Sequence, residues 1–261
     1  MKSLENIWEE RERQQLMRII FIRHGDPDYV NDSLTEKGIR EAKLLAKRVA
    51  KWDNITQFYC SPLGRAKKTA SYSLEAVGRE AVTYEWMKEF SYFIDDPVTG
   101  RHGVPWDFMP AYWTEIPEMY DREGWKDTAI YRSNEELLPA YNEVCEGLDG
   151  LLSSYGYTRH NNYYLTDPTK KDDSTKAEDT IVIFCHLGVT CMMLSHLLGI
   201  SPVPLLHGFF LAPTSVTVLA SEERMENNAI FRVQVMGDVT HLLTGGEPVS
   251  HAGYFTDPFQ G

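Results

Sequence analysis

The feature that most constrains the fold is a strand pattern followed by a helix pattern, which recurs along the chain. Residues 19–22 read IIFI, a continuous β-branched and aromatic run typical of parallel strands covered on both faces. Over residues 33–52, apolar side chains recur at three- and four-residue spacing, and Thr35 is placed to cap a helix. The same plan returns over residues 55–78 and 179–200. Strands alternating with helices favour right-handed βαβ units and a parallel sheet between two helical layers.

Two more strands are expected near the C-terminus, over residues 214–221 and 229–238, and they are adjacent enough to complete the sheet. We therefore predict an α/β protein, a three-layer α/β/α sandwich with a mostly parallel central sheet and an inserted cap. With 43% hydrophobic residues in 261, the chain can bury the core of one domain. That domain is expected over residues 16–261, after a charged N-terminal arm over residues 1–15.

Two stretches interrupt the alternation of strands and helices. Residues 90–133 carry three tryptophans with several prolines and glycines, so they are too long for a plain connection and too aromatic to be disordered. We interpret them as the inserted cap. Residues 158–179 are polar and lysine-rich, and are expected to form a surface loop. Between the two, residues 133–156 have the pattern of a helix that returns to the core.

Charge and cysteine content narrow the possible partners. The chain has 26 basic and 38 acidic residues, a formal charge of −12, which disfavours nucleic acid and anionic lipid as partners. Its four cysteines form no CxxC pair, as expected for free thiols in a reducing compartment. No apolar stretch approaches the ~20 residues that span a bilayer. We therefore expect a cytoplasmic protein without a membrane partner; the sequence leaves its oligomeric state open.

Unusual polar residues follow three of the predicted strands. Arg23 and His24 end the first strand, Arg65 lies near the start of the helix after the second, and His186 ends a later strand. Because ligands of open α/β sheets bind outside the carboxyl ends of the strands, these side chains should converge. Helix N-termini at the same edge favour anions. The sequence therefore predicts a site for a dianionic tetrahedral group.

A phosphoryl group suits these residues chemically. Guanidinium groups hold its oxygens with two parallel hydrogen bonds, and a neutral histidine can attack phosphorus in line with the leaving group. Nearby arginines disfavour the imidazolium, which would keep His24 nucleophilic. The Arg-His-Gly tripeptide recurs over residues 101–103, but no apolar strand precedes that copy, and we interpret it as a surface loop. The remaining histidines lack metal-ligand spacing, so no metal site is expected.

Taken together, the Arg-His-Gly strand end, LTEKGIREA, SPLGRAKKTA and IVIFCHLG resemble the histidine phosphatase superfamily, the phosphoglycerate mutase-like proteins. The resemblance covers nearly the whole chain except the arm and the two interrupting stretches. It implies that His24 is transiently phosphorylated, and that Arg23, Arg65 and His186 hold the phosphoryl oxygens. Leu187 completes the candidate substrate-binding residues, which are Arg23, Arg65, His186 and Leu187.

The family also uses a carboxylic acid after the third strand to protonate the leaving oxygen. Glu85 and Glu89 are both available in TYEWMKEF, and Glu89 fits the family pattern more closely. Glu85 is then a solvated carboxylate. If neither were the acid, Asp95 and Asp96 in the cap would be the next candidates.

The chain departs from phosphoglycerate mutases directly after Arg-His-Gly. Those proteins continue with an acidic residue, a serine and a Trp-Asn pair; here Asp26 keeps the charge, Pro27 replaces the serine and Asn31 falls at a different spacing. We therefore predict a metal-independent histidine phosphatase, a phosphoric monoester hydrolase that needs no cofactor and acts on a small phosphorylated metabolite. A phosphoglycerate mutase is the alternative among enzymes. A non-catalytic protein that binds a phosphorylated ligand is the alternative from another class.

Overall fold

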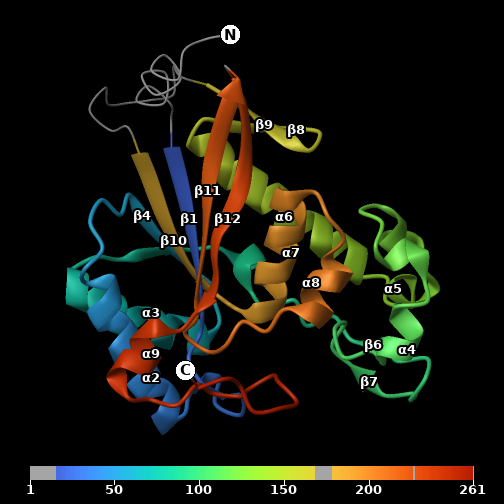
Figure 1. Ribbon diagram of the computed structural model, residues 1–261, viewed down its shortest axis with the longest axis horizontal. Coiled ribbons are helices and arrows are strands. Elements are labelled where there is room, and N and C mark those ends of the chain that lie inside the picture. The colour runs from blue at the N-terminus through green and yellow to red at the C-terminus, as the bar shows by residue number, and fades with distance from the viewer. Residues whose placement is uncertain (1–15, 168–177, 226, 261) are drawn as a thin grey trace.

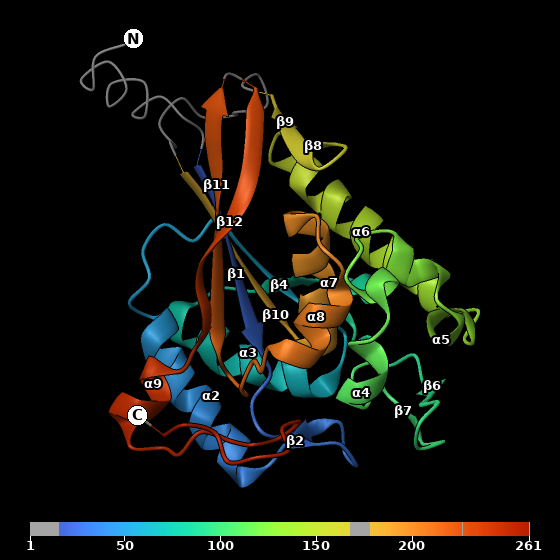
Figure 2. The ribbon, with the colours of Figure 1, turned by 45° about the vertical axis from the view of Figure 1, so that its right-hand side comes forward.

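The computed structural model describes residues 16–167, 178–225 and 227–260, and its central element is an eight-stranded sheet between helical layers (Figures 1 and 2). The strand order is β5-β4-β10-β1-β11-β12-β9-β8. In that order the strands span Ala81–Thr83, Gln57–Cys60, Glu178–Cys185, Leu16–Arg23, Val216–Met225, Asn228–Asp238, Tyr163–Thr166 and Tyr157–His160. The predicted α/β class is confirmed.

The sheet is mixed, with one parallel half and one antiparallel half. Strands β5, β4, β10 and β1 run parallel to one another, and β11, β12, β9 and β8 add to β1 in antiparallel pairs. The two predicted C-terminal strands are therefore present, but they make the sheet less parallel than expected. They follow each other closely in the sequence, and so short a connection can join only antiparallel neighbours.

Helices cover both faces of the sheet, which confirms the three layers. One face carries α2 (Glu36–Val49), α3 (Gly64–Val77) and α9 (Thr240–Gly245), and the other carries α6 (Leu137–Ser154), α7 (Leu187–Leu198) and α8 (Pro202–Gly208). Side chains of β1 alternate between these layers: Ile19 and Phe21 pack with α7, whereas Ile20 and Ile22 pack with α2 and α3. A strand buried on both faces explains the continuous apolar run.

The predicted cap over residues 90–133 contains only short elements. They are β6 (Ile94–Asp95), β7 (His102–Gly103), α4 (Pro110–Trp113), η2 (Pro117–Met119), η3 (Gly124–Asp127) and α5 (Ala129–Arg132). Trp125 and Tyr131 are fully buried and belong to the same apolar cluster as α6 and α7. The insertion is thus anchored by its aromatic residues on the α6–α7 side of the sheet. In the described ranges, no helix has the length and apolar character needed to cross a bilayer.

The predicted surface loop over residues 158–179 is corrected in its first part. Residues 157–166 form the β8–β9 hairpin, which extends the antiparallel edge of the sheet. Tyr157 and Tyr164 are buried there, and their rings lie 5.5 and 5.3 Å from that of Phe231. Burial of these two rings outweighs the polar residues between them, which explains why a polar stretch forms strands. Residues 168–177 and the predicted arm over residues 1–15 lie outside the described residues.

Candidate active site

The predicted phosphoryl-binding residues meet at the carboxyl ends of three adjacent parallel strands. In the sheet, β10 lies between β4 and β1, and Arg23 pairs in register with Cys185. The backbone N–H of His24 donates to the Cys185 carbonyl at 3.0 Å, and that of Ser61 donates to the Phe184 carbonyl at 2.9 Å. The His24 and His186 rings are consequently 5.1 Å apart between centroids. The parallel half of the sheet therefore brings the two histidines together, as predicted.

His24 is held in one tautomer by the residue that follows it. Its side chain is 1% exposed, and its Nδ1 lies 2.7 Å from the Gly25 carbonyl oxygen. A carbonyl oxygen can only accept, so Nδ1 carries the proton and Nε2 keeps its lone pair. Burial, with the charges of Arg23 and Arg65, holds the pKa of His24 well below its usual range. His24 is thus a neutral imidazole with a free Nε2.

Gly25 allows the loop after His24 to approach helix α2. A Cβ at this position would lie 2.8 Å from the Gly38 carbonyl oxygen, closer than real Cβ contacts allow. The Gly25 N–H also donates to Thr69 Oγ1 of α3 at 2.9 Å. The glycine of the Arg-His-Gly motif is therefore required because the backbone runs directly against α2.

Arg23 is buried, and its two terminal nitrogens are bound to backbone. Nη1 donates to the Leu211 carbonyl at 2.6 Å and Nη2 to the Ala252 carbonyl at 2.9 Å. Nε is buried without a hydrogen-bond partner among the described residues. Desolvation lowers the pKa of Arg23, although the guanidinium stays charged. Two carbonyls thus orient the guanidinium, and Nε remains able to donate to an anion.

Arg65 lies in the first turn of α3 and shares its charge with Asp32. Its Nη1 is 2.7 Å from Asp32 Oδ1, while Asp32 Oδ2 accepts from the Gly64 N–H at 2.5 Å. The Arg65 guanidinium also lies 5.5 Å from the centre of the Tyr29 ring. Its Nε, like that of Arg23, is buried with no partner in the part of the chain that the structure describes. Asp32 therefore fixes the guanidinium of Arg65 through Nη1, and Nε can still donate to an anion.

His186 is fully buried at the N-terminus of α7. Its Nε2 lies 2.7 Å from Ser61 Oγ, and its Nδ1 is buried without a partner within the described ranges. Burial, followed by the charges of His24 and the two arginines, holds the pKa of His186 well below its usual range. Leu187 is the first residue of α7, so its backbone N–H belongs to the helix end that favours anions.

Glu89, and not Glu85, is brought to this site. Glu89 follows the 3₁₀ turn η1 (Glu85–Met87), and its Oε1 accepts from the Phe90 N–H at 2.8 Å and the Val189 N–H of α7 at 3.0 Å. Burial raises the pKa of Glu89 against the opposing effect of those two hydrogen bonds and of the nearby arginines. Glu85 is exposed. A carboxyl group whose pKa is raised by burial suits a general acid.

The other acid candidates and the second Arg-His-Gly copy lie in the insertion. Asp95 is exposed, and its carboxylate is 2.8 Å from Nδ1 of His102, also exposed. Asp96 accepts from the Val98 N–H at 2.8 Å and closes a turn. Arg101 is an exposed partner of Asp107. The second Arg-His-Gly copy, predicted to be a surface loop, is corrected in part, because His102 and Gly103 form strand β7, which pairs with β6. It does not end a buried strand of the central sheet.

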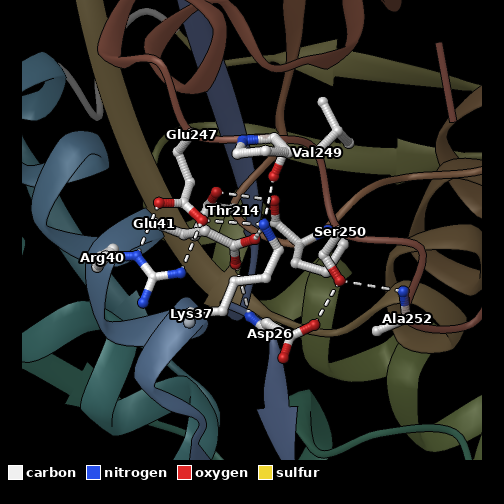
Figure 3. Close-up of polar contacts among 12 residues, drawn as sticks. Asp26, Lys37, Arg40, Glu41, Thr214, Glu247, Val249, Ser250 and Ala252 are labelled. Carbon is white, nitrogen blue, oxygen red and sulfur yellow. Dashed lines mark hydrogen bonds and ion pairs between the residues drawn. The ribbon is translucent and has the colours of Figure 1, made fainter. Parts of the chain in front are cut away.

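Sequence reasoning missed the C-terminal segment, which binds the loop after His24 (Figure 3). Ser250 Oγ donates to the Asp26 carboxylate and accepts from the Ala252 N–H. Arg40 of α2 donates to Glu247 at 2.8 Å, and Lys37 contacts the same carboxylate at 3.0 Å. This docking brings the Ala252 carbonyl within hydrogen-bond distance of Arg23, the last residue of β1. These residues lie more than 200 positions from their partners, and no local pattern indicates the contact.

Together these groups can bind and transfer a phosphoryl group. The site offers a free imidazole nitrogen, two guanidinium Nε donors, a second imidazole and a carboxyl group with a raised pKa. No cluster of three or more His, Cys, Asp or Glu side chains that could hold a metal ion is found among the residues described by the structure.

Sequence reasoning also missed Ser61, which contacts His186. The available signal was its place before proline in SPLGRAKKTA.

Part of the chain matches a known protein family. Residues 19–96 match the histidine phosphatase superfamily (branch 1). Over 83 residues the chain is 32% identical to a probable phosphoglycerate mutase of Serratia proteamaculans, a match that spans 28% of this chain and 38% of that protein. The matched stretch thus spans well under half of that relative.

Two solved structures share the fold. A mycobacterial glucosyl-3-phosphoglycerate phosphatase has a TM-score of 0.56 and 16% identity, covering 85% of this chain and 99% of its own. A phosphoserine phosphatase mutant of Entamoeba histolytica, in complex with phosphoserine, has a TM-score of 0.52 and 20% identity, covering 87% and 99%. At these identities the likeness establishes the fold.

Proposed function

Because the chain belongs to the histidine phosphatase superfamily, we propose that it is a phosphomonoesterase that hydrolyses a small phosphorylated metabolite through a phosphohistidine at His24. The observation that carries this proposal is the contact between His24 Nδ1 and the Gly25 carbonyl oxygen, which implies one tautomer of the imidazole. The Gly25 carbonyl binds Nδ1, so the lone pair of a neutral imidazole is left at Nε2. Such a nitrogen is a competent nucleophile at neutral pH.

In the first half-reaction, His24 Nε2 attacks phosphorus, and the bond to the ester oxygen breaks as the new N–P bond forms. The three equatorial oxygens face the Nε donors of Arg23 and Arg65 and the imidazole of His186. Protonated Glu89 gives its proton to the departing oxygen, so the alcohol leaves neutral. Preorganised donors at the developing charge supply the main stabilisation.

In the second half-reaction, water attacks the phosphohistidine from the side the alcohol has left. Glu89, now a carboxylate, takes a proton from this water while the N–P bond breaks. The products are inorganic phosphate and His24 restored as a neutral imidazole. No metal is required in either step, because the two arginines supply positive charge and hydrogen bonds, and neutral His186 supplies a further hydrogen bond.

The charges of the insertion support a phosphatase over a phosphoglycerate mutase. A phosphoglycerate carries a carboxylate beside its phosphoryl group, and that carboxylate needs a second cation. Every cation in residues 90–133 already contacts a neighbouring acid; the pairs are Arg101–Asp107, Arg122–Glu123, Lys126–Glu123 and Arg132–Asp127. Pro27 also stands where phosphoglycerate mutases have a serine, so the chain lacks that hydroxyl.

Two paired assays test the function. Hydrolysis of a panel of small phosphomonoesters should release inorganic phosphate, with activity retained after treatment with a chelator. Interconversion of 2- and 3-phosphoglycerate, measured with the same protein, should be slower than hydrolysis of the best ester. Faster interconversion would identify a mutase. Binding of phosphate without turnover of any ester would support the non-catalytic alternative.

A further inference from the structure

Ser61 is fixed at the end of β4 so that its hydroxyl meets His186. The residue is fully buried, and its backbone N–H is bound to the neighbouring strand at Phe184. Its Oγ accepts from the Leu63 N–H at 3.2 Å and lies 2.7 Å from His186 Nε2. The Ser61 hydroxyl therefore already accepts one hydrogen bond, and its own proton still needs an acceptor.

His186 has a single proton to share between two buried nitrogens. Burial and its charged neighbours keep the imidazole neutral, so only one of Nδ1 and Nε2 is protonated. Nε2 faces Ser61, and Nδ1 lies without a partner among the described residues, although it is buried. The tautomer decides whether the unpartnered nitrogen is a donor or a lone pair.

The two tautomers differ in how many buried groups are satisfied. If Nε2 carried the proton, Ser61 Oγ would accept twice, and its own proton would be buried without an acceptor. Nδ1 would then present a lone pair to the oxygens of a phosphoryl dianion, which is repulsive. If Ser61 donates to Nε2, its proton is satisfied and Nδ1–H is a donor. Without a ligand each tautomer leaves one buried donor unpartnered among the described residues, Ser61 O–H in the first and His186 Nδ1–H in the second. The first also leaves the Nδ1 lone pair unpartnered, so the second tautomer has fewer unsatisfied buried groups and is favoured.

We propose that Ser61 is a positioning residue whose hydroxyl donates to His186 Nε2 and thereby keeps His186 Nδ1–H as a donor to the phosphoryl oxygens. The role at the phosphoryl group rests on the proposed function, whereas the tautomer itself does not. His24 and His186 then present opposite groups to the substrate, each set by its hydrogen bond to one oxygen atom. The Gly25 carbonyl leaves His24 a lone pair for attack, and the Ser61 hydroxyl leaves His186 a proton for binding.

The tautomer can be measured without any substrate. In ¹⁵N-labelled protein free of ligand, long-range ¹H–¹⁵N spectra distinguish a protonated from an unprotonated imidazole nitrogen, and His186→Gln identifies the signals by their loss. We expect His186 with Nδ1 protonated and Nε2 unprotonated. A wild-type spectrum with Nε2 protonated overturns the proposal, whatever the enzyme's activity.

Variants then test the role of the hydroxyl. Ser61→Ala should shift the His186 signals towards the Nε2–H tautomer and weaken binding of inorganic phosphate, while Ser61→Thr should retain both. On p-nitrophenyl phosphate, Ser61→Ala should lower kcat/KM by about 10- to 100-fold, less than removal of a whole oxyanion donor. Unchanged signals in a folded Ser61→Ala protein would contradict the proposal.

Ser73→Ala is the matched control, since Ser73 is also a fully buried serine and lies on α3. It should leave the His186 tautomer and phosphate affinity unchanged. If Ser73→Ala moved the His186 signals as much as Ser61→Ala, a general packing effect would replace the proposed hydrogen bond. If the tautomer is as expected but no ester is hydrolysed, the proposed function fails and the tautomer assignment stands.

Discussion

The phosphoryl site and the insertion over residues 90–133 use charge in different ways. In the site, Arg23 and Arg65 are buried, and each keeps an Nε without a partner in the described chain. In the insertion, every cation pairs with a nearby carboxylate, and Arg101 and Arg132 are highly exposed. Exposed pairs contribute little energy, whereas buried donors interact strongly with an anion. The comparison supports the proposed binding of a phosphoryl group at the strand ends rather than in the insertion.

The two regions also differ in how their positions are determined. The site residues follow strands whose neighbours bind them in register, and carbonyls or carboxylates hold most of the side chains. The insertion consists of short elements anchored through buried aromatic rings such as Trp125. Substitutions in the site should therefore change the rate of the chemical steps, and those in the insertion should change substrate preference. The following predictions test this division.

The largest effect is expected from His24→Ala, because the nucleophile acts as a unit with the groups around it. We expect kcat on the best ester to fall by ~10⁴-fold or more. The matched control is His102→Ala in the second Arg-His-Gly copy, which is exposed in the insertion. It should retain activity within about threefold of wild type. Both kcat values are measured by steady-state kinetics. An equal loss of kcat in His24→Ala and His102→Ala would contradict the proposed difference between the site and the insertion.

Glu89→Gln should show a loss that depends on the leaving group. An alkyl phosphate has a basic leaving oxygen that needs a proton, so its kcat/KM should fall by about 10²–10⁴-fold. The p-nitrophenyl ester should lose far less, since its leaving group is stable as an anion. The control Glu85→Gln should leave both substrates nearly unchanged. The reverse pattern would assign the acid to Glu85, and equal losses on both esters would place it in the insertion, at Asp95 or Asp96.

Arg65→Lys tests whether a planar donor, rather than a positive charge alone, is needed. Lysine cannot bind Asp32 and a phosphoryl oxygen from one rigid group, so we expect kcat/KM to fall by about 10²-fold. Lys68→Arg, in the same helix, is the control and should have little effect. Arg65→Lys kinetics close to wild type would show that Arg65 does not contact the phosphoryl group.

Glu41 supplies a smaller effect, on stability. It is fully buried on α2 and accepts from the Asp26 N–H, and burial raises its pKa from 4.5 to about 7. The pKa of Glu41 is higher in the folded protein than in the unfolded chain, so its protonated carboxyl favours folding. This contribution to the free energy of unfolding is complete below pH about 4.5 and is lost as the pH rises through about 7. Glu41→Gln should flatten the fall in unfolding free energy between pH 5 and 8 by up to ~3 kcal/mol. The control is Glu118→Gln, which removes a carboxylate of the insertion. In thermal melts, its free energy of unfolding should change with pH as that of the wild type does.

The parallel half of the sheet and its site could be predicted because the signals are local. Apolar runs mark β1 and β10, and the topology of parallel strands brings their ends together at Arg23, His24 and His186. The β8–β9 hairpin was not predicted, since only Tyr157 and Tyr164 reveal its buried face among polar neighbours. The two strands of this hairpin each bury one tyrosine ring within a largely polar stretch, and a single buried ring per strand is too weak a pattern to predict a strand.

Contacts between distant segments were beyond prediction for a different reason. The carbonyls of Leu211 and Ala252 orient Arg23, but a carbonyl is present in every residue and leaves no mark in the sequence. Ser61 could have been singled out by its place in SPLGRAKKTA, yet its partner His186 is 125 residues away. The sequence thus predicted which side chains meet at the strand ends, and the structure was needed to find what holds them.

The central claim is that His24 Nε2 carries the phosphoryl group during turnover. The protein should be mixed for milliseconds with an ester labelled at phosphorus and quenched in alkali, because acid hydrolyses phosphohistidine. Peptide mapping should then find the label on His24, at Nε2 and not at Nδ1, since the Gly25 carbonyl occupies the Nδ1 proton. Turnover without label on His24 at any time point, or label on Nδ1, would contradict the account.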